Sequence, residues 1–312
     1  MEKRPEISLI IPVKDERGSL DQLVKEIYEG CSPLNKSFEM IFVDDGSIDG
    51  SFELLENLRK KDKRIKVFRL RKNFGKSTAL MVGFDNAQGE IQITLDGDLQ
   101  DNPIEIPRFI QKLDQGYDVV SGWKKKRHDP LNKTVPSKIF NLLTAKLTKI
   151  KIHDFNCGFK AYRKEVTKKL NLYGELYRFV PVLVEQMGYK VGEITVRHRK
   201  RKYGKSKYGS GRIVKGLLDL ITVLFLGGYA TRPGHFFGSL GILFFIPGFL
   251  IGLYITYLRI TTGGIGFHYP LLFLGVLFII VGIQFISTGL LAEMLLSSKD
   301  KSDTEDLISK KT

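Results

Sequence analysis

The 312-residue sequence has too little cysteine for a fold held by disulfides. Its two cysteines are Cys31 and Cys157, and we expect both to be free thiols in a reducing compartment. A secretory signal is not expected either. The first apolar stretch, residues 7–13, is too short for one and continues directly into charged sequence.

Charged side chains are missing from two long stretches in the last third of the chain. No Asp, Glu, Lys or Arg occurs within residues 236–258 or 269–292. Each stretch meets the roughly 20 residues needed to cross a bilayer. We therefore predict two transmembrane helices, at about residues 235–258 and 269–293, with a buried core helix as the alternative for each.

The distribution of basic residues predicts how these helices are oriented. Lys and Arg are dense before the first stretch and recur after the second, whereas the connecting loop carries only Arg259. The positive-inside rule then places both termini and the N-terminal domain in the cytoplasm. We expect a multi-pass protein of the cytoplasmic (inner) cell membrane with a polar cytoplasmic tail at residues 299–312.

The first two thirds of the chain lack the Gly-rich turn of a dinucleotide-binding fold. Apolar runs at residues 7–13, 38–43, 66–70 and 90–95 instead alternate with helical segments. This alternation predicts an α/β domain over residues 1–212 with a mostly parallel sheet.

Ligands of such sheets gather where the strands end. This rule brings together Pro12, Asp44, Asp45, Arg71 and Asp96. Basic residues such as Lys76, just before a predicted helix at residues 77–87, can contact phosphate with help from the helix dipole, a solvated turn being the alternative. A P-loop is excluded because Leu70 stands where that motif needs its first glycine.

Two carboxylates, Asp96 and Asp98, follow the strand at residues 90–95 and are separated by one glycine. Carboxylates at a strand end are hard ligands for Mg²⁺ or Mn²⁺, and phosphates can share the coordination shell of such a cation. An EF-hand is excluded because Gly97 is second and Pro107 twelfth in the loop. An N-capping turn before the next helix remains the structural alternative.

Basic residues form two further groups. One is the run at residues 124–128 with Lys133 nearby, for which a solvated face is the alternative. Residues 137–150, starting at Ser137, predict a helix suited to an anionic membrane surface, or equally a helix that faces the core. The other group, residues 198–208, packs six Lys and Arg around a Gly-x-Ser and predicts a phosphate clamp.

Residues 213–226 are largely apolar but too short to span a membrane, and residues 213–232 form the segment between the α/β domain and the first predicted span. We predict an interfacial amphipathic helix that leads into the two spans.

Six motifs together resemble those of inverting GT-A glycosyltransferases of the polyprenyl-phosphate type, which include dolichol-phosphate mannose synthases and bactoprenol glucosyltransferases. The motifs are Ile10–Val13, Val43–Ser47, Asn73–Lys76, Leu95–Asp101, Asp154–Phe159 and Arg201–Lys207. They extend over about residues 5–210, and the two C-terminal spans are similar to those of the bactoprenol branch. Each motif is weak alone, but their order and spacing are specific.

The resemblance implies a GT-A (Rossmann-like) catalytic domain and a set of donor-site residues. The predicted nucleotide-binding residues are Pro12, Asp15, Glu16, Asp44, Asp45, Lys76 and Asp96, with Asp45 in the position that usually meets the base. Asp96, Asp98 and Gln100 are the predicted ligands of Mg²⁺ or Mn²⁺. Asp154 stands where the family is often assigned a catalytic carboxylate, and Asp98 is the second predicted catalytic residue.

The acceptor phosphate is expected to meet basic residues. The predicted set is Lys124, Arg127, Lys133, Ser137, Arg201 and Lys207. The family commonly has arginines where this chain has Lys124 and Lys133, which removes bidentate contacts there. Arg127 fits the family pattern better.

The implied reaction is transfer of a hexose from a nucleotide sugar to a membrane polyprenyl phosphate such as undecaprenyl phosphate, with inversion. UDP-glucose is the first expected donor and GDP-mannose the second. A processive polysaccharide synthase is disfavoured because Trp123, the only tryptophan, is outside a Gln-x-x-Arg-Trp motif. A non-catalytic membrane sensor explains the charge but not the carboxylates. We expect no nucleic-acid partner, and a homo-oligomer is left open.

Overall fold

The computed structural model describes residues 4–125, 141, 144–146, 148, 150–200, 222–223 and 233–297. It divides into two compact units, residues 1–224 and 225–312, and each is considered by itself.

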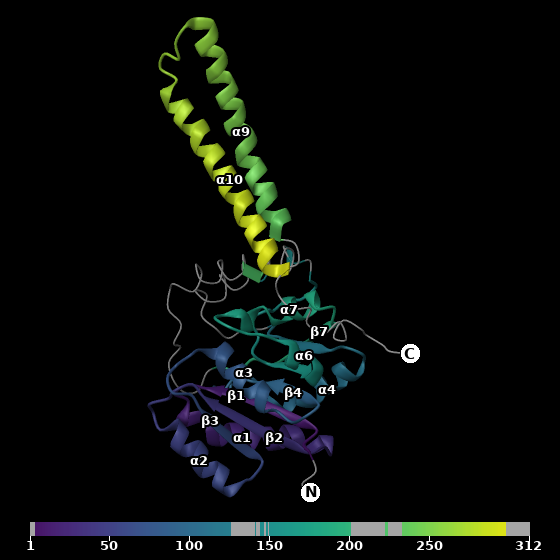
Figure 1. Ribbon diagram of the computed structural model, residues 1–312. Helices are drawn as coiled ribbons and strands as arrows, with labels where there is room; N and C mark the ends of the chain where they lie inside the picture. Colours follow the sequence, from purple (N-terminus) through teal and green to yellow (C-terminus); the bar gives the residue numbers. More distant parts are fainter. Residues whose placement is uncertain are drawn as a thin grey trace. The chain divides into compact units, whose positions relative to one another are not determined.

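The N-terminal unit alternates strands and helices (Figure 1). Its first half comprises β1 (Ile7–Val13), α1 (Arg17–Cys31), β2 (Phe38–Asp44), α2 (Ser51–Lys61), β3 (Ile65–Arg69), α3 (Lys76–Asn86) and β4 (Ile91–Thr94). Its second half comprises α4 (Ile106–Asp114), β5 (Val119–Trp123), β6 (Lys160–Arg163), α6 (Lys164–Lys169), α7 (Val180–Gln186) and β7 (Val191–Thr195). Short 3₁₀ turns are η1 (Ser32–Leu34), η2 (Pro103–Glu105) and η3 (Leu176–Arg178).

The strands form one seven-stranded sheet in the order β3-β2-β1-β4-β6-β5-β7. Neighbours from β3 to β4 are parallel, as are β5 and β7, whereas β6 runs antiparallel to both β4 and β5. The expected α/β architecture with a mostly parallel sheet is confirmed. The antiparallel strand β6 was not anticipated, because four residues are too short for a clear periodic pattern.

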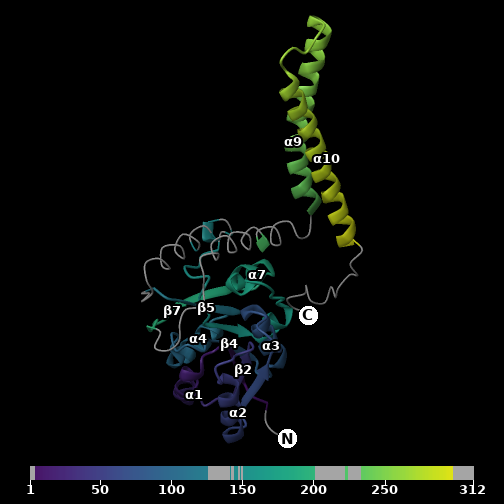
Figure 2. The same ribbon diagram turned by 90° about the vertical axis from the view of Figure 1, so that its left-hand side faces the viewer.

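Strand periodicity explains how both faces of the sheet are covered. Ile7, Leu9 and Ile11 of β1 belong to a buried cluster that also holds side chains of α1 and α4. Ile10, which points to the opposite face, belongs to a second cluster with α3 and α7. The two clusters make a three-layer α/β/α arrangement, seen from the side in Figure 2.

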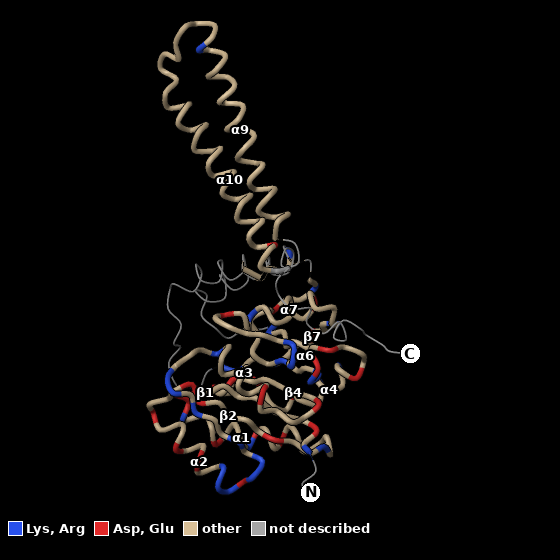
Figure 3. Tube along the Cα trace, viewed as in Figure 1, with Lys and Arg blue, Asp and Glu red and all other residues tan. Residues whose placement is uncertain are grey.

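The C-terminal unit is a hairpin of α9 (Pro233–Thr262) and α10 (Tyr269–Ser297). Both helices are long and apolar enough to cross a membrane by length and composition. Figure 3 shows the hairpin almost wholly in tan, whereas the N-terminal unit carries Lys, Arg, Asp and Glu along its loops. Both helices extend beyond the predicted span limits, which stay predictions.

Glycines bring α9 and α10 together at intervals of seven residues. On α10, Gly275, Gly282 and Gly289 lie against Gly248, Gly241 and Gly234 of α9. A Cβ added at Gly282 would lie 2.8 Å from the carbonyl oxygen of Gly241. Small residues at such positions let two helix backbones approach closely in a membrane.

Candidate active site

The carboxyl ends of three parallel strands meet at one edge of the sheet. Val13 of β1 pairs with Asp44 of β2, and the amide of Asp45 donates to the carbonyl of Val13 at 2.8 Å. The amide of Leu95, just after β4, donates to the carbonyl of Ile10 at 3.2 Å. The predicted rim of Pro12, Asp44, Asp45 and Asp96 is therefore assembled by the sheet topology.

The turns after β1 and β2 are hydrogen-bonded to each other. The amide of Asp15 donates to Ser47 Oγ at 2.8 Å, and the amide of Ile48 donates to Asp15 Oδ1 at 2.8 Å. The amide of Glu16 donates to Ser51 Oγ at 3.0 Å. Asp15 has a φ of +47°, a conformation uncommon for residues other than glycine. These bonds hold the predicted nucleotide-binding residues Asp15 and Glu16 in a defined turn.

Asp45 connects this turn to the segment before α3. Its Oδ1 accepts from the amide of Phe74 at 2.7 Å, and its Oδ2 accepts from the amide of Gly75 at 3.0 Å. Burial raises the pKa of Asp45, and the two amides with Lys14 only partly offset this. In this structure the carboxylate predicted to meet the base therefore also shapes the turn leading into α3.

The Asp44 carboxylate bonds to groups inside the protein. Its side chain is fully buried, with Oδ1 accepting from the amide of Ser47 at 3.0 Å and Oδ2 lying 3.4 Å from Arg69 Nε. The predicted nucleotide contact of Asp44 stays a prediction, and the observed bonds stabilise the loop after β2.

Asp96 lies in a basic environment. Lys76 Nζ contacts its Oδ1, and a Cβ at Gly158 would collide with its carboxylate at 2.6 Å. Partial burial opposes the charge of Asp96, but the ammonium groups of Lys76, Lys124 and Lys160 outweigh it and hold the pKa of Asp96 below its usual range. Asp96 is therefore an anion at neutral pH.

Asp98 and Gln100 form a compact turn with the segment after β7. Asp98 is buried, and its Oδ1 accepts from the amide of Gln100 at 3.0 Å. The amide of Arg199 donates to the carbonyl of Gln100 at 3.0 Å, while the Arg199 guanidinium contacts Glu26 at 2.6 Å and Asn102 at 2.7 Å. These contacts attach the acidic turn to α1 and to residues just ahead of Arg201.

The alternative reading, in which Asp96 and Asp98 cap the next helix, is contradicted by Asn102. Its Oδ1 accepts from the amide of Ile104 at the start of η2, so the side chain that caps this turn is not Asp96 or Asp98.

Within the described residues, no three His, Cys, Asp or Glu side chains converge to hold a metal ion. Magnesium is commonly bound by one or two carboxylates together with substrate phosphates and waters. Asp96 and Asp98 carry hard oxygen donors of the kind that such a substrate-completed site would need, and metal binding by them stays a prediction.

Lys124, predicted to meet the acceptor, is paired inside the protein. Its Nζ lies 2.7 Å from Oδ1 of the buried Asp101. Burial disfavours its charge, but Asp101, with Asp96 contributing, raises the pKa of Lys124 above its usual range. Contact of this ammonium with a lipid phosphate stays a prediction.

Asp154 is buried in the loop before β6. Its Oδ1 accepts from the amide of Asn156 at 3.2 Å, and its Oδ2 accepts from the amide of Lys124 at 3.4 Å. The carboxylate thus lies near the end of β5, and its predicted catalytic role stays a prediction.

Lys160 is a residue of this site that sequence reasoning missed. Its Nζ donates to the carbonyl oxygens of Phe155, at 3.4 Å, and Cys157, so it holds the loop that carries Asp154. Burial lowers the pKa of Lys160 to about 8. A lysine two residues after Gly158 in a short segment was the only signal available, and it is indistinguishable from a surface lysine.

The two cysteines are free and buried, as expected, and burial raises the pKa of each thiol to about 12. Five predicted acceptor residues lie outside the described residues: Arg127, Lys133, Ser137, Arg201 and Lys207. The predicted interfacial helix at residues 213–232 lies almost entirely outside them as well.

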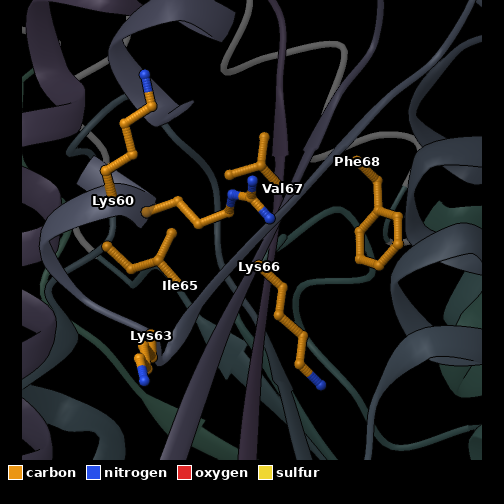
Figure 4. A pocket seen from close by; sticks show the side chains of 7 residues that line it. Lys60, Lys63, Ile65, Lys66, Val67 and Phe68 are labelled. Atoms are coloured by element: carbon orange, nitrogen blue, oxygen red, sulfur yellow. The ribbon is translucent and has the colours of Figure 1, made fainter. Parts of the chain in front are cut away.

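A cavity of about 400 Å³ lies away from the strand ends (Figure 4). It borders the start of β3, at the edge of the sheet. Its lining consists of Arg59, Lys60, Lys63, Ile65, Lys66, Val67 and Phe68. None of the predicted site residues lines it, and one of its lysines, Lys66, is paired with Glu39 at 2.6 Å.

A family model described as glycosyl transferase family 2 matches residues 8–170, which include the strand ends and the carboxylates described above. This chain belongs to that family. The predicted family resemblance is confirmed.

Two curated relatives extend the similarity over nearly the whole chain. One is a dodecaprenyl-phosphate galacturonate synthase from Rhizobium johnstonii, 37% identical, with 96% of this chain and 90% of the relative covered. Another is an undecaprenyl-phosphate 4-deoxy-4-formamido-L-arabinose transferase from Pseudomonas aeruginosa, 34% identical, with 93% and 84% covered.

A solved structure shares the fold. Glucosyl-3-phosphoglycerate synthase from Mycobacterium tuberculosis, crystallised with Mn²⁺, UDP and glucosyl-3-phosphoglycerate, gives a TM-score of 0.55 at 17% identity, over 72% of this chain and 80% of that one. The expected GT-A fold is confirmed, with two C-terminal apolar helices that could span a membrane.

Proposed function

We propose that this glycosyltransferase moves a sugar from a nucleotide sugar to a membrane polyprenyl phosphate. The observation that carries the proposal is the juxtaposition of Asp96, Asp98, Asp45 and Asp154 at one edge of the sheet, in a chain of family 2 whose relatives are named for polyprenyl-phosphate products or acceptors. The non-catalytic sensor gains no support from these carboxylates.

The donor proposed from sequence is UDP-glucose, with GDP-mannose next. The names of the two relatives carry galacturonate and 4-deoxy-4-formamido-L-arabinose, so uronic acid and pentose donors join the panel to be tested.

In the proposed reaction Asp15, Glu16 and Asp45 hold the nucleotide, and Asp96 and Asp98 would hold Mg²⁺ or Mn²⁺. When bound, the metal neutralises charge that develops on the leaving nucleoside diphosphate. The acceptor phosphate attacks the anomeric carbon opposite that group, which inverts its configuration. A phosphate monoester is already anionic near neutral pH, so Asp154 orients the acceptor more than it removes a proton.

The membrane supplies the acceptor. We propose that α9 and α10 span the cytoplasmic membrane with both termini and the catalytic unit in the cytoplasm, as the basic residues predict. Assembly into a homo-oligomer stays an open prediction.

The test is transfer of labelled sugar into an organic-extractable lipid by the purified full-length protein. The assay uses undecaprenyl phosphate and UDP-glucose, GDP-mannose, UDP-galacturonic acid or UDP-4-deoxy-4-formamido-L-arabinose, with and without chelator. We expect one donor to give chelator-sensitive product. Absence of lipid product with every nucleotide sugar would contradict the proposal.

Asp98→Asn sharpens this test. We expect turnover to fall by about 100-fold or more, because the variant loses a carboxylate that would hold the charge-neutralising metal. Membrane extraction and thermal unfolding should stay those of the wild type, and retained turnover would contradict the assignment of Asp98.

A further inference from the structure

Lys76 places its ammonium on a carboxylate that the proposed reaction also needs. It is the first residue of α3 and contacts Asp96 Oδ1, and its Nζ lies 5.1 Å from the centre of the Tyr177 ring. Asp96 is therefore already neutralised by an internal cation. An isolated carboxylate so poorly solvated would be costly, which gives this pairing a physical reason.

Three lysines lie around Asp96, and their ammonium groups have different partners. Lys124 is bound to the fully buried carboxylate of Asp101, and Lys160 to the carbonyl oxygens of its own loop. The Lys76–Asp96 pair is more accessible, with side chains 18% and 31% exposed, compared with 12% and 0% for Lys124–Asp101. Lys76 is thus the lysine whose partner can be exchanged most readily.

The surroundings of Lys76 suit a phosphate. Lys76 begins a helix of 11 residues, whose first amides and dipole favour an anion. Gly75, immediately before it, has a φ of +95°, and a Cβ added there would meet nothing within 4 Å. Open space therefore adjoins the turn at Gly75 from which α3 begins.

We propose that Lys76 is an exchangeable counter-ion. It neutralises Asp96 while the donor site is empty, and it transfers to the diphosphate when a nucleotide sugar arrives with its metal. An ammonium and a divalent cation on the same carboxylate repel each other, so binding of the metal displaces Lys76 toward the incoming negative charge. This inference rests on the proposed function because it requires a nucleoside diphosphate as ligand.

The exchange predicts effects of opposite sign when the ammonium is removed. In Lys76→Met, Mn²⁺ alone should bind about threefold tighter or more, because a partly exposed competing ion pair is lost. UDP measured at saturating Mn²⁺ should bind about tenfold weaker or more, because a charge-assisted bond to phosphate is lost. A merely structural role would weaken both.

The experiment measures Mn²⁺ binding by electron paramagnetic resonance and UDP binding by calorimetry on the purified full-length protein. Lys76→Arg keeps the charge and should restore both affinities toward wild-type values, and Lys76→Gln is a second neutral variant should Lys76→Met fail to fold. Lys66→Met is the matched control, since Lys66 forms a close lysine–carboxylate pair with Glu39 away from the strand ends and should change neither affinity.

Opposed shifts in the neutral variants support the exchange. Parallel losses, no change, or a change in only one of the two affinities overturns it, as does a wild-type protein that binds no UDP. If the neutral variants show the opposed shifts but the wild type transfers no sugar to lipid, the exchange is supported and the proposed function alone is contradicted.

Discussion

The two units of this protein bury opposite kinds of residue. In the α/β unit the largest wholly buried side chains include Phe42, Phe109 and Tyr162, whereas the close contacts of the α9–α10 hairpin are made by glycines. The large apolar side chains of the hairpin, such as Phe273 and Leu291, point outward.

This inversion matches the proposal that the α/β unit lies in water and the hairpin in a membrane. In water, removal of apolar surface drives packing, so bulky side chains belong inside. Lipid tails are as apolar as leucine, so that drive is lost and close backbone approach becomes the main source of helix contact. The polar strand-end loops belong to the α/β unit, which packs as expected of a protein in water.

The largest expected effect comes from truncating a buried ring in the α/β unit. Phe109 is wholly buried on α4, with its ring centre 4.2 Å from that of Phe159. We expect Phe109→Ala to lower the free energy of unfolding by about 3–5 kcal/mol, because it removes buried area and leaves a cavity. Circular dichroism during denaturation in detergent measures it.

The matched substitution in the hairpin is Phe273→Ala, at a side chain that is 70% exposed. It should change the unfolding free energy by well under about 1 kcal/mol. Equal losses from the two substitutions would break the comparison.

An intermediate effect is expected from adding a side chain between α9 and α10. A Cβ at Gly282 would lie 2.8 Å from both the Gly241 oxygen and the Phe245 amide nitrogen, so Gly282→Leu must push the helices apart. We expect the free energy of unfolding to fall by about 1–3 kcal/mol, which is typical of overpacking, as measured by thermal unfolding in detergent.

Gly252→Leu provides the control on α9, because a Cβ there meets nothing within 4 Å. It should leave the unfolding temperature close to that of the wild type. If both leucine variants unfold alike, close glycine packing is not what stabilises the hairpin.

A pH-dependent effect is expected from the buried Lys160. Its pKa is about 8 in the folded protein, below the roughly 10.4 of an unfolded chain. Between these values the unfolded state binds more protons, so this lysine makes the unfolding free energy rise with pH, by up to about 1.4 kcal/mol per pH unit. Below about pH 8 both states are charged and the contribution is constant.

Lys160→Met should remove this rise while leaving the remaining pH dependence intact. The measurement is the difference in unfolding free energy between variant and wild type from pH 7.5 to 10.5. An unchanged difference across that interval would show that Lys160 does not titrate within it.

Much of the architecture was predictable because it depends on local patterns. Continuous apolar runs located β1 to β4, and the absence of charge located α9 and α10. The rule that ligands gather at strand ends predicted Asp45 and Asp96 at one edge of the sheet. Family resemblance, carried by short motifs in order, was confirmed over residues 8–170.

Other features depended on partners distant in the chain. The insertion of β6 between β4 and β5 could not be predicted, because its four residues carry little periodic signal. The position of a strand in the sheet is decided by its pairing with other strands. The packing role of the glycines spaced by seven residues could not be predicted, because it depends on the antiparallel pairing of α9 and α10 that brings Gly241 against Gly282.

The sequence by itself determined where β1 to β4 and the two long apolar helices lie, since hydrophobic period and charge act over neighbouring residues. The tertiary structure alone decided the pairing of charges: Lys76 with Asp96, Lys124 with Asp101, and Lys160 with the loop of Asp154. Lys160 reads as an ordinary surface residue in the sequence, and the phosphate contacts predicted for Lys76 and Lys124 gave no sign of these internal partners. Burial and proximity, which arise only when the chain folds, gave them their electrostatic roles.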